Sequence, residues 1–132
     1  MSTPGKNYMF TLQYEGDPPM TPSSDAVKEH ASYMVYQSEM APTTGQLHLQ
    51  GFIKFLKDKR LNGAKSIVCS LFSVSSVHIT KGDGKAYAMS AYCQKEDTRV
   101  PGTSPTVFGS LPQASTSSSY SEAITSTFQA VS

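Results

Sequence analysis

Alternating apolar and polar side chains mark several β-strands along this chain. The clearest alternation runs through residues 46–55, QLHLQGFIKF, where one face would carry Leu47, Leu49, Gly51, Ile53 and Phe55 and the other His48, Gln50, Phe52 and Lys54. Since successive side chains of a strand point to opposite faces, this pattern predicts a strand with one apolar and one more polar face. Strands are also expected at residues 7–14, 32–40 and 73–80, and a short edge strand within residues 106–111.

Three further segments have the composition of helices. Residues 21–31 offer Ser24 or Asp25 as an N-cap, residues 61–72 follow the long strand, and residues 84–97 combine preceding glycines with Ala, Met and Lys. Strands and helices therefore alternate, except for two consecutive strands joined by a short loop. We expect an α+β fold with a central, mainly antiparallel five-stranded sheet flanked by helices, in a ferredoxin-like or RRM-like split βαβ arrangement.

The composition of the chain changes near Pro101. The 132 residues are 38% hydrophobic and 16% charged overall, as in a soluble globular protein. Residues 101–132 contain one acid, Glu122, and no base. Such a segment buries too little apolar surface to offset its ordering entropy. We therefore expect one globular domain over residues 1–109 and a Ser/Thr-rich linker or tail, disordered or weakly helical, over residues 110–132.

The net charge of the chain is only +1, so its overall charge gives no case for binding nucleic acid. The exception is a local basic cluster at Lys54, Lys57, Lys59 and Arg60, with Lys65 beyond it. This cluster could hold phosphates, but a solvated charged edge explains it equally well.

The two cysteines, Cys69 and Cys93, belong to no CxxC pair and cannot form a disulfide framework. This cysteine usage suits a reducing compartment. The sequence also has no signal peptide and no apolar run long enough to cross a bilayer. We expect a soluble, intracellular protein with no membrane partner.

The polar face of residues 46–55 raises the question of a metal site. His48 and Gln50, at i and i+2, project from one face of a strand with Cα atoms about 6.5 Å apart, so both could reach one cation. The short loop after the preceding strand could fold Glu39 back beside His48. These three ligands would suit Mn²⁺ or Mg²⁺ and leave positions open for substrate and water. A solvated strand face remains the simpler reading of the pair alone.

The expected helix at residues 84–97 raises the question of a nucleophile. Tyr92 and Lys95 would lie about 60° apart around its axis, whereas Tyr87 would lie about 140° from Tyr92. A nearby cation could activate the Tyr92 phenol for phosphoryl transfer. A solvated surface pair of tyrosine and lysine has the same spacing.

Three short motifs occur in order along the chain: MFTLQY at residues 9–14, HLQGF at 48–52 and AYCQKED at 91–97. Together they resemble the HUH endonuclease domain of replication-initiator (Rep) proteins from small circular single-stranded DNA viruses, especially the circovirus and nanovirus branch. In that branch glutamine replaces the second histidine of His-hydrophobic-His, and the third motif is Tyr-x-x-Lys. One difference is Gln13, which stands where asparagine is common in the first motif. The resemblance covers residues 8–97.

This resemblance implies a specific chemistry. Glu39, His48 and Gln50 would bind one divalent ion, Mn²⁺ or Mg²⁺. Tyr92 would attack a phosphodiester of single-stranded DNA in the stem-loop of a viral origin, leaving a 3′-hydroxyl and a 5′-phosphotyrosine, and Lys95 would assist at the metal or the leaving group. The tyrosyl ester keeps the energy of the broken phosphodiester bond, so the site could rejoin strands without ATP. Nicking in this way starts rolling-circle replication, and rejoining ends it. The resemblance also implies residence in the host nucleus.

The same resemblance places Phe10, Thr11 and Gln13 on a central strand under the bound DNA. These residues would serve recognition and structure rather than chemistry. Full-length Rep proteins of this type also carry a helicase domain, whose ATP site needs a GxxxxGK[ST] loop. Residues 62–66, NGAKS, lack the first glycine and the spacing. We therefore expect nicking and joining without unwinding, and oligomers only in a full-length protein.

Two other functions fit parts of the sequence. RRM-like sheets bind single strands through exposed aromatics and need neither a metal nor a reactive tyrosine. The RRM signature K/R-G-F/Y-G/A-F-V-x-F/Y is absent, which disfavours this non-catalytic binding module. A metal-dependent hydrolase that activates water usually needs more carboxylates than the sequence brings together.

Overall fold

A computed structural model describes residues 3–82 and 84–111. Its strands are β1 (Gly5–Tyr14), β2 (Ala31–Met40), β3 (Leu47–Lys59), β4 (His78–Lys81) and β5 (Thr106–Gly109), and its helices are α1 (Ser24–His30), α2 (Leu61–Phe72) and α3 (Ala86–Tyr92). The expected α+β class is confirmed. The tail expected at residues 110–132 lies outside the described residues except for its first two positions, so that expectation stays a prediction.

The five strands form one sheet in the order β4-β1-β3-β2-β5, and every pairing in it is antiparallel. Because β3 lies between β1 and β2 and is antiparallel to both, β1 and β2 run in the same direction. Helix α1 lies in the connection between these two strands. This is the expected split βαβ arrangement, with β5 added beside β2 as the edge strand that residues 106–111 predicted.

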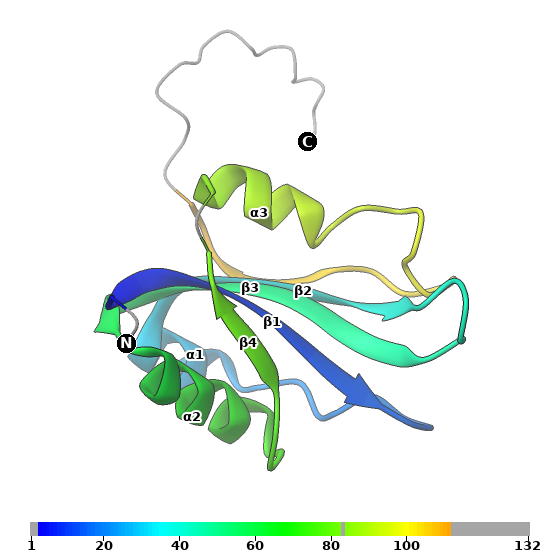
Figure 1. Ribbon diagram of the computed structural model, residues 1–132, viewed down its shortest axis with the longest axis horizontal. Coiled ribbons are helices and arrows are strands. Elements are labelled where there is room, and N and C mark those ends of the chain that lie inside the picture. The colour runs from blue at the N-terminus through cyan, green and yellow to red at the C-terminus, as the bar shows by residue number, and fades with distance from the viewer. Residues whose placement is uncertain (1–2, 83, 112–132) are drawn as a thin grey trace, which may run out of the picture.

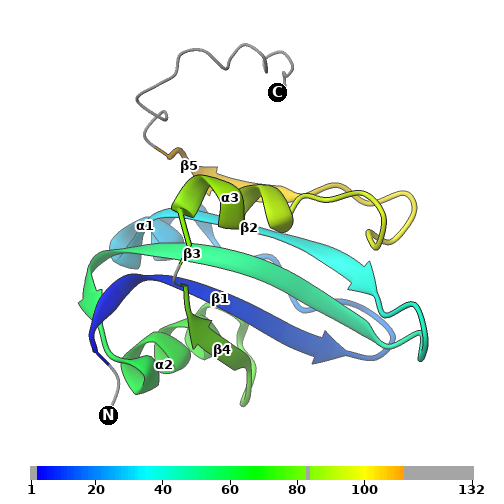
Figure 2. The same cartoon turned by 45° about the horizontal axis from the view of Figure 1, so that its top comes forward.

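The helices divide between the two faces of the sheet. Figure 1 shows α1 and α2 below the sheet and α3 above it, and the turned view in Figure 2 keeps α3 over β3 and β2. We call these the α1/α2 face and the α3 face. The main core lies on the α1/α2 face, where side chains of β1, β3 and β2 meet those of α1 and α2; its largest members are Tyr8, Phe10, Met34, Leu49, Ile53, Phe55 and Phe72. Each such side chain, when fully buried, contributes about 1.5–3 kcal/mol.

A smaller core holds α3 against the other face. Tyr33, Val35, Phe52 and Cys93 are buried together there. The Tyr33 hydroxyl also lies 2.6 Å from Ser90 Oγ in a buried hydrogen bond between β2 and α3. These contacts fix α3 over one part of its face, and no other helix within residues 3–82 and 84–111 covers the rest of that face (Figure 2).

One glycine of the HLQGF motif has a packing role. Gly51 lies opposite Phe10 in the β1–β3 register, and a Cβ added at Gly51 would overlap the Phe10 ring. That ring is buried and lies 5.7 Å from the Phe72 ring, measured between centroids, so it has little room to move. A glycine is therefore required where the backbone of β3 approaches an aromatic ring.

Several predicted boundaries were wrong. The N-cap of α1 is Ser23, whose Oγ accepts a hydrogen bond from the Ala26 N–H, and not Ser24 or Asp25. The long strand continues to Lys59. Residues 73–77 are not part of a strand, because Ser73 ends α2 in a left-handed conformation at φ 57° and the chain turns there before β4 begins at His78.

The largest difference concerns the third helix, which was expected to reach Asp97 but ends at Tyr92. The chain beyond it is held against β2 instead. Gln37 Nε2 donates to the Lys95 carbonyl at 2.7 Å, and the Met40 N–H donates to the Thr98 carbonyl at 3.0 Å. These tertiary bonds replace the helical bonds that the local sequence favoured.

No helix in the part of the chain that the structure describes is long and apolar enough to cross a bilayer.

Candidate metal and nucleophile site

Two rows of polar side chains cross the three central strands on the α3 face. In the sheet register Gln13 of β1 pairs with His48 of β3, and His48 pairs with Glu39 of β2. The next row runs in the same way through Thr11, Gln50 and Gln37. Directly opposite residues of antiparallel strands have Cβ atoms about 5 Å apart. The register alone therefore brings Glu39 and His48 together, as the expected hairpin required, and sets Gln50 one row away.

Glu39 is the buried charge at the centre of this site, with 3% of its surface exposed. Lys95 Nζ lies 3.0 Å from its Oε1 and 2.9 Å from its Oε2, and Gln37 Nε2 donates to Oε2 at 2.9 Å. Burial acts to raise the pKa of Glu39, but the hydrogen bond from Gln37 and the charge and hydrogen bonds of Lys95 together lower it. Glu39 is therefore ionised at neutral pH.

His48 faces this carboxylate. Its Nδ1 lies 3.3 Å from the Gln46 carbonyl oxygen, and its Nε2 lies 3.4 Å from Glu39 Oε1. A ring nitrogen and a carboxylate oxygen this close can share either a proton or a cation, and both atoms are of types that bind divalent metals.

The donor set fits Mn²⁺ or Mg²⁺ only if Gln50 takes part. The described residues contain no group of three or more His, Cys, Asp and Glu side chains that could hold a metal. Gln50 supplies an amide oxygen instead, which at present accepts a 3.2 Å hydrogen bond from Thr11 Oγ1. Glu39, His48 and Gln50 together offer oxygen, nitrogen and oxygen, and Lys95 shares the carboxylate with any ion bound there.

Tyr92 and Lys95 lie together, although not through the helical geometry expected for them. Tyr92 is the last residue of α3, and Lys95 lies beyond the helix with its Nζ 4.4 Å from the centroid of the Tyr92 ring. The same ammonium group contacts Glu39, so it lies between the phenol ring and the carboxylate. Tyr92 is 52% exposed and accessible to a large substrate. Tyr87 is also exposed, at 56%.

Gln37 is a site residue that the sequence reasoning missed. It is 1% exposed, and its Nε2 donates to both the Glu39 carboxylate and the Lys95 carbonyl, which joins β2 to the chain after α3. Its Oε1 is buried without a hydrogen-bond partner. A signal was present, because Gln37 and Glu39 have the same i and i+2 spacing on a strand as His48 and Gln50.

Cys93 follows Tyr92 in sequence but belongs to the core under α3. Burial, with a smaller effect from the charge of Glu39, raises the pKa of its thiol to about 12. Cys93 is therefore a packing residue.

Phe10 and the basic cluster, which were expected to contact DNA, lie away from the candidate metal and nucleophile site. The side chain of Phe10 is buried on the α1/α2 face, so it cannot contact DNA bound on the α3 face; Thr11 and Gln13 do face that side. The basic cluster lies toward the opposite end of β3 from His48; its members are Lys54, Lys57, Lys59 and Arg60. At about 3.3 Å per residue, Lys57 is roughly 30 Å along the strand from His48. Only nucleic acid that extends well beyond the site could reach both.

The chain is similar to known replication proteins. Residues 5–96 match the family model described as "Putative viral replication protein". The chain is 32% identical over 80% of its length to Para-Rep C9 of Faba bean necrotic yellows C9 alphasatellite, and 37% identical over 69% to Para-Rep C2 of Milk vetch dwarf C2 alphasatellite. It is 33% identical over 72% of its length to the Master replication protein of Faba bean necrotic yellows virus. The aligned part spans 32%, 31% and 29% of these relatives. On the family match over most of its length, this chain belongs to the viral replication protein family.

Proposed function

We propose that this protein initiates viral DNA replication by nicking and joining single-stranded DNA at the replication origin. Its relatives are named as replication proteins, and they share this region. The observation that carries the proposal is the position of Lys95 Nζ, in contact with both the Tyr92 ring and the Glu39 carboxylate. The Lys95 ammonium group thus links the exposed phenol of Tyr92 to the buried carboxylate of Glu39.

Tyr92 would act as the nucleophile. Its phenolic oxygen attacks the phosphorus of one phosphodiester and loses its proton to solvent, while the bond from phosphorus to the 3′-oxygen breaks and that oxygen takes up a proton. The products are a free 3′-hydroxyl and a 5′-phosphate esterified to Tyr92. Attack by a 3′-hydroxyl on this ester reverses the step and joins the strand without ATP.

Lys95 would support the reaction electrostatically. Its ammonium group places positive charge beside the Tyr92 ring, where negative charge develops on the attacking oxygen. Gln37 acts as a positioning residue, because it holds both the Lys95 backbone and the carboxylate that orients the Lys95 side chain.

Glu39, His48 and Gln50 would hold one divalent ion, Mn²⁺ or Mg²⁺. When bound, such an ion polarises a phosphate oxygen and stabilises the charge of the transition state. The 3.4 Å approach of His48 Nε2 to Glu39 Oε1 supports this assignment. Thr11 would contribute by orienting the Gln50 amide.

A non-catalytic RRM-like module is the rival proposal, and the exposed surface disfavours it. Such modules stack bases on aromatic side chains of the central strands. Of the described aromatic residues, those with large exposure are Tyr87 and Tyr92, and both belong to α3 rather than to the sheet.

The decisive experiment is capture of the covalent intermediate. The protein is mixed with Mn²⁺ and a pool of DNA stem-loops with randomised single-stranded loops, and the products are separated on a denaturing gel. We expect a protein–DNA adduct that Tyr92→Phe abolishes and Tyr87→Phe retains. An adduct that persists in Tyr92→Phe but disappears in Tyr87→Phe would overturn the assignment, and binding without any adduct would favour the passive module.

The physiological setting follows from this proposal. The partner is single-stranded DNA at an origin stem-loop, and replication of such DNA takes place in the host nucleus. A fluorescent fusion expressed in plant cells should therefore accumulate in nuclei, and uniform exclusion from nuclei would contradict this part of the proposal.

A further inference from the structure

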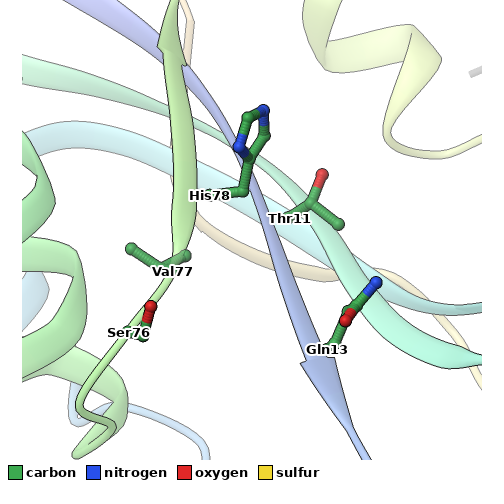
Figure 3. Close-up of a pocket in the computed structure, with 5 residues that line it drawn as sticks. All are labelled: Thr11, Gln13, Ser76, Val77 and His78. Atoms are coloured by element: carbon green, nitrogen blue, oxygen red, sulfur yellow. The ribbon is translucent and has the colours of Figure 1, made fainter.

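A second polar site lies beside the row of Thr11, Gln50 and Gln37. A groove of about 530 Å³ opens at the corner where β4 begins, lined by Thr11 and Gln13 of β1, His78 of β4 and the preceding Ser76 and Val77. Figure 3 shows the side chains of Thr11, Gln13 and His78 projecting to the same side of the sheet. Thr11 pairs directly with His78 in the β1–β4 register. His78 is not one of the candidate metal ligands or reactive groups.

We propose that this groove, which we call the His78 groove, binds one nucleobase of the DNA strand and that His78 helps determine which base is accepted. The proposal deepens the proposed function and rests on it. It assigns a specificity role to a residue that no sequence motif marked.

The chemistry of the lining favours a base over a phosphate. The groove is lined by hydroxyl, amide and imidazole groups with one apolar side chain, and by no Lys, Arg, Asp or Glu. Phosphate recognition in proteins relies largely on cations and backbone N–H groups. A base is flat and uncharged and carries hydrogen-bond donors and acceptors on its edge, which hydroxyl and amide side chains can satisfy. An imidazole ring provides a surface on which such a base stacks.

The size and exposure of the groove agree with a nucleotide. A volume of about 530 Å³ lies within the range of roughly 300–1,000 Å³ that is typical of small-molecule sites. His78 and Gln13 are exposed, and Val77 is buried and forms an apolar part of the wall.

The groove is also coupled to the metal and nucleophile site by position. Thr11 Oγ1 donates to Gln50 Oε1 at 3.2 Å, and Gln13 lies opposite His48 in the register. Thr11 and Gln13 on β1 are therefore one strand spacing, about 4.8 Å, from the expected metal ligands on β3, and His78 on β4 is two strands from β3. A strand whose phosphate lies at Tyr92 and His48 would place a neighbouring base over β1 and β4.

The experiment is a base-preference measurement on adduct formation. Wild type, His78→Ala and His30→Ala are each allowed to react with the randomised stem-loop pool in Mn²⁺, and the DNA that forms adducts is sequenced. His30 is the matched control, because it is a histidine of α1 on the α1/α2 face. We expect His78→Ala to lose the base preference at one loop position, keep it at the others, and need about tenfold more DNA for half-maximal adduct. His30→Ala should match wild type.

Two further variants separate the contributions of the ring. His78→Phe keeps a flat ring and should retain most of the affinity but lose preference among bases, whereas His78→Gln should lose affinity. A thermal melt shows whether His78→Ala folds. If it does not, His78→Phe and His78→Gln test the proposal in its place.

Each outcome decides the matter. An unchanged preference profile in His78→Ala, with normal adduct formation, overturns the base site and leaves the proposed function intact. A uniform loss of adduct with an unchanged profile also overturns it, because a merely structural role gives that result. No adduct from wild type with any loop sequence refutes the proposed function, and this inference with it.

Discussion

Glu39 and Lys95 form the closest charge pair of the site, with Nζ 3.0 and 2.9 Å from the two carboxylate oxygens, and they come from positions 56 residues apart in the chain. The carboxylate is buried, while Lys95 remains partly exposed. This pair connects the sheet, which would hold the metal, to the segment that follows α3, whose last residue is the proposed nucleophile Tyr92. The geometry of the site therefore depends on a contact between two distant parts of the sequence.

Removal of Lys95 should destabilise the fold. Lys95→Met leaves the Glu39 carboxylate buried without its cation, and the partial exposure of Lys95 reduces the cost to about 2 kcal/mol, below the roughly 3–5 kcal/mol expected for a fully buried pair. Urea denaturation at neutral pH in the presence of a chelator measures this loss in the free energy of unfolding. The control is Lys65→Met, at an exposed position of α2. The double variant Lys95→Met/Glu39→Gln should recover part of the loss. If the free energy of unfolding of Lys95→Met differs from that of wild type by less than about 0.5 kcal/mol, Glu39 and Lys95 do not stabilise each other.

Mn²⁺ should stabilise the protein through Glu39, His48 and Gln50. An ion that binds only the folded state, at a concentration a hundredfold above its Kd, adds about 2.7 kcal/mol to the free energy of unfolding. Thermal melts with Mn²⁺ and with EDTA should therefore differ, and the difference should vanish in His48→Ala but persist in His30→Ala. If His48→Ala responds to Mn²⁺ as wild type does, the ion binds elsewhere.

Gly51 should not tolerate a side chain. Gly51→Ala forces its methyl group into the buried ring of Phe10, and overpacking of this kind costs typically about 1–3 kcal/mol. Gly63 of α2 is the matched control, because a Cβ added there meets nothing within 4 Å. Gly63→Ala should instead stabilise the helix by about 0.5–1 kcal/mol. Urea midpoints of the two variants should move in opposite directions, and equal shifts would refute the packing account.

The two cysteines should differ in their reactivity. Thiolate is the species that reacts with iodoacetamide, and burial raises the pKa of Cys93 to about 12, so at pH 8 nearly all of that thiol is protonated as well as inaccessible. Cys69 is only partly buried. Mass spectrometry after brief labelling at pH 8 should find the modification on Cys69 and not on Cys93, and unfolding in urea should expose both. Fast labelling of native Cys93 would mean that α3 detaches readily from the sheet.

Local patterns predicted much of the fold. Alternation identified the strand that carries His48 and Gln50, and helical composition identified α2 with its bounds. These features could be predicted because burial of one strand face or one helix stripe leaves a regular period in the sequence itself. The motif order supported the family, which the comparisons confirmed.

Other features depended on contacts that no local period records. The end of α3 was missed because Gln37 and the edge of β2 bind the chain after Tyr92, and such tertiary bonds override local helix propensity. Phe10 was assigned to the DNA side because the motif gives the strand but not which of its faces is buried. His78 and Gln37 carried no motif at all.

The sequence by itself determined the α+β class, the strands and helices of the domain, and the residue types available for metal and phosphoryl chemistry, because these follow from interactions between near neighbours in the chain. Only the tertiary structure decided that Glu39 lies opposite His48, that Lys95 reaches Glu39, and that His78 joins Thr11 and Gln13 in one groove. Strand register and the docking of a returning segment are set by packing between distant residues, and a one-residue shift in register would have moved the side chains of the shifted strand to the other face of the sheet.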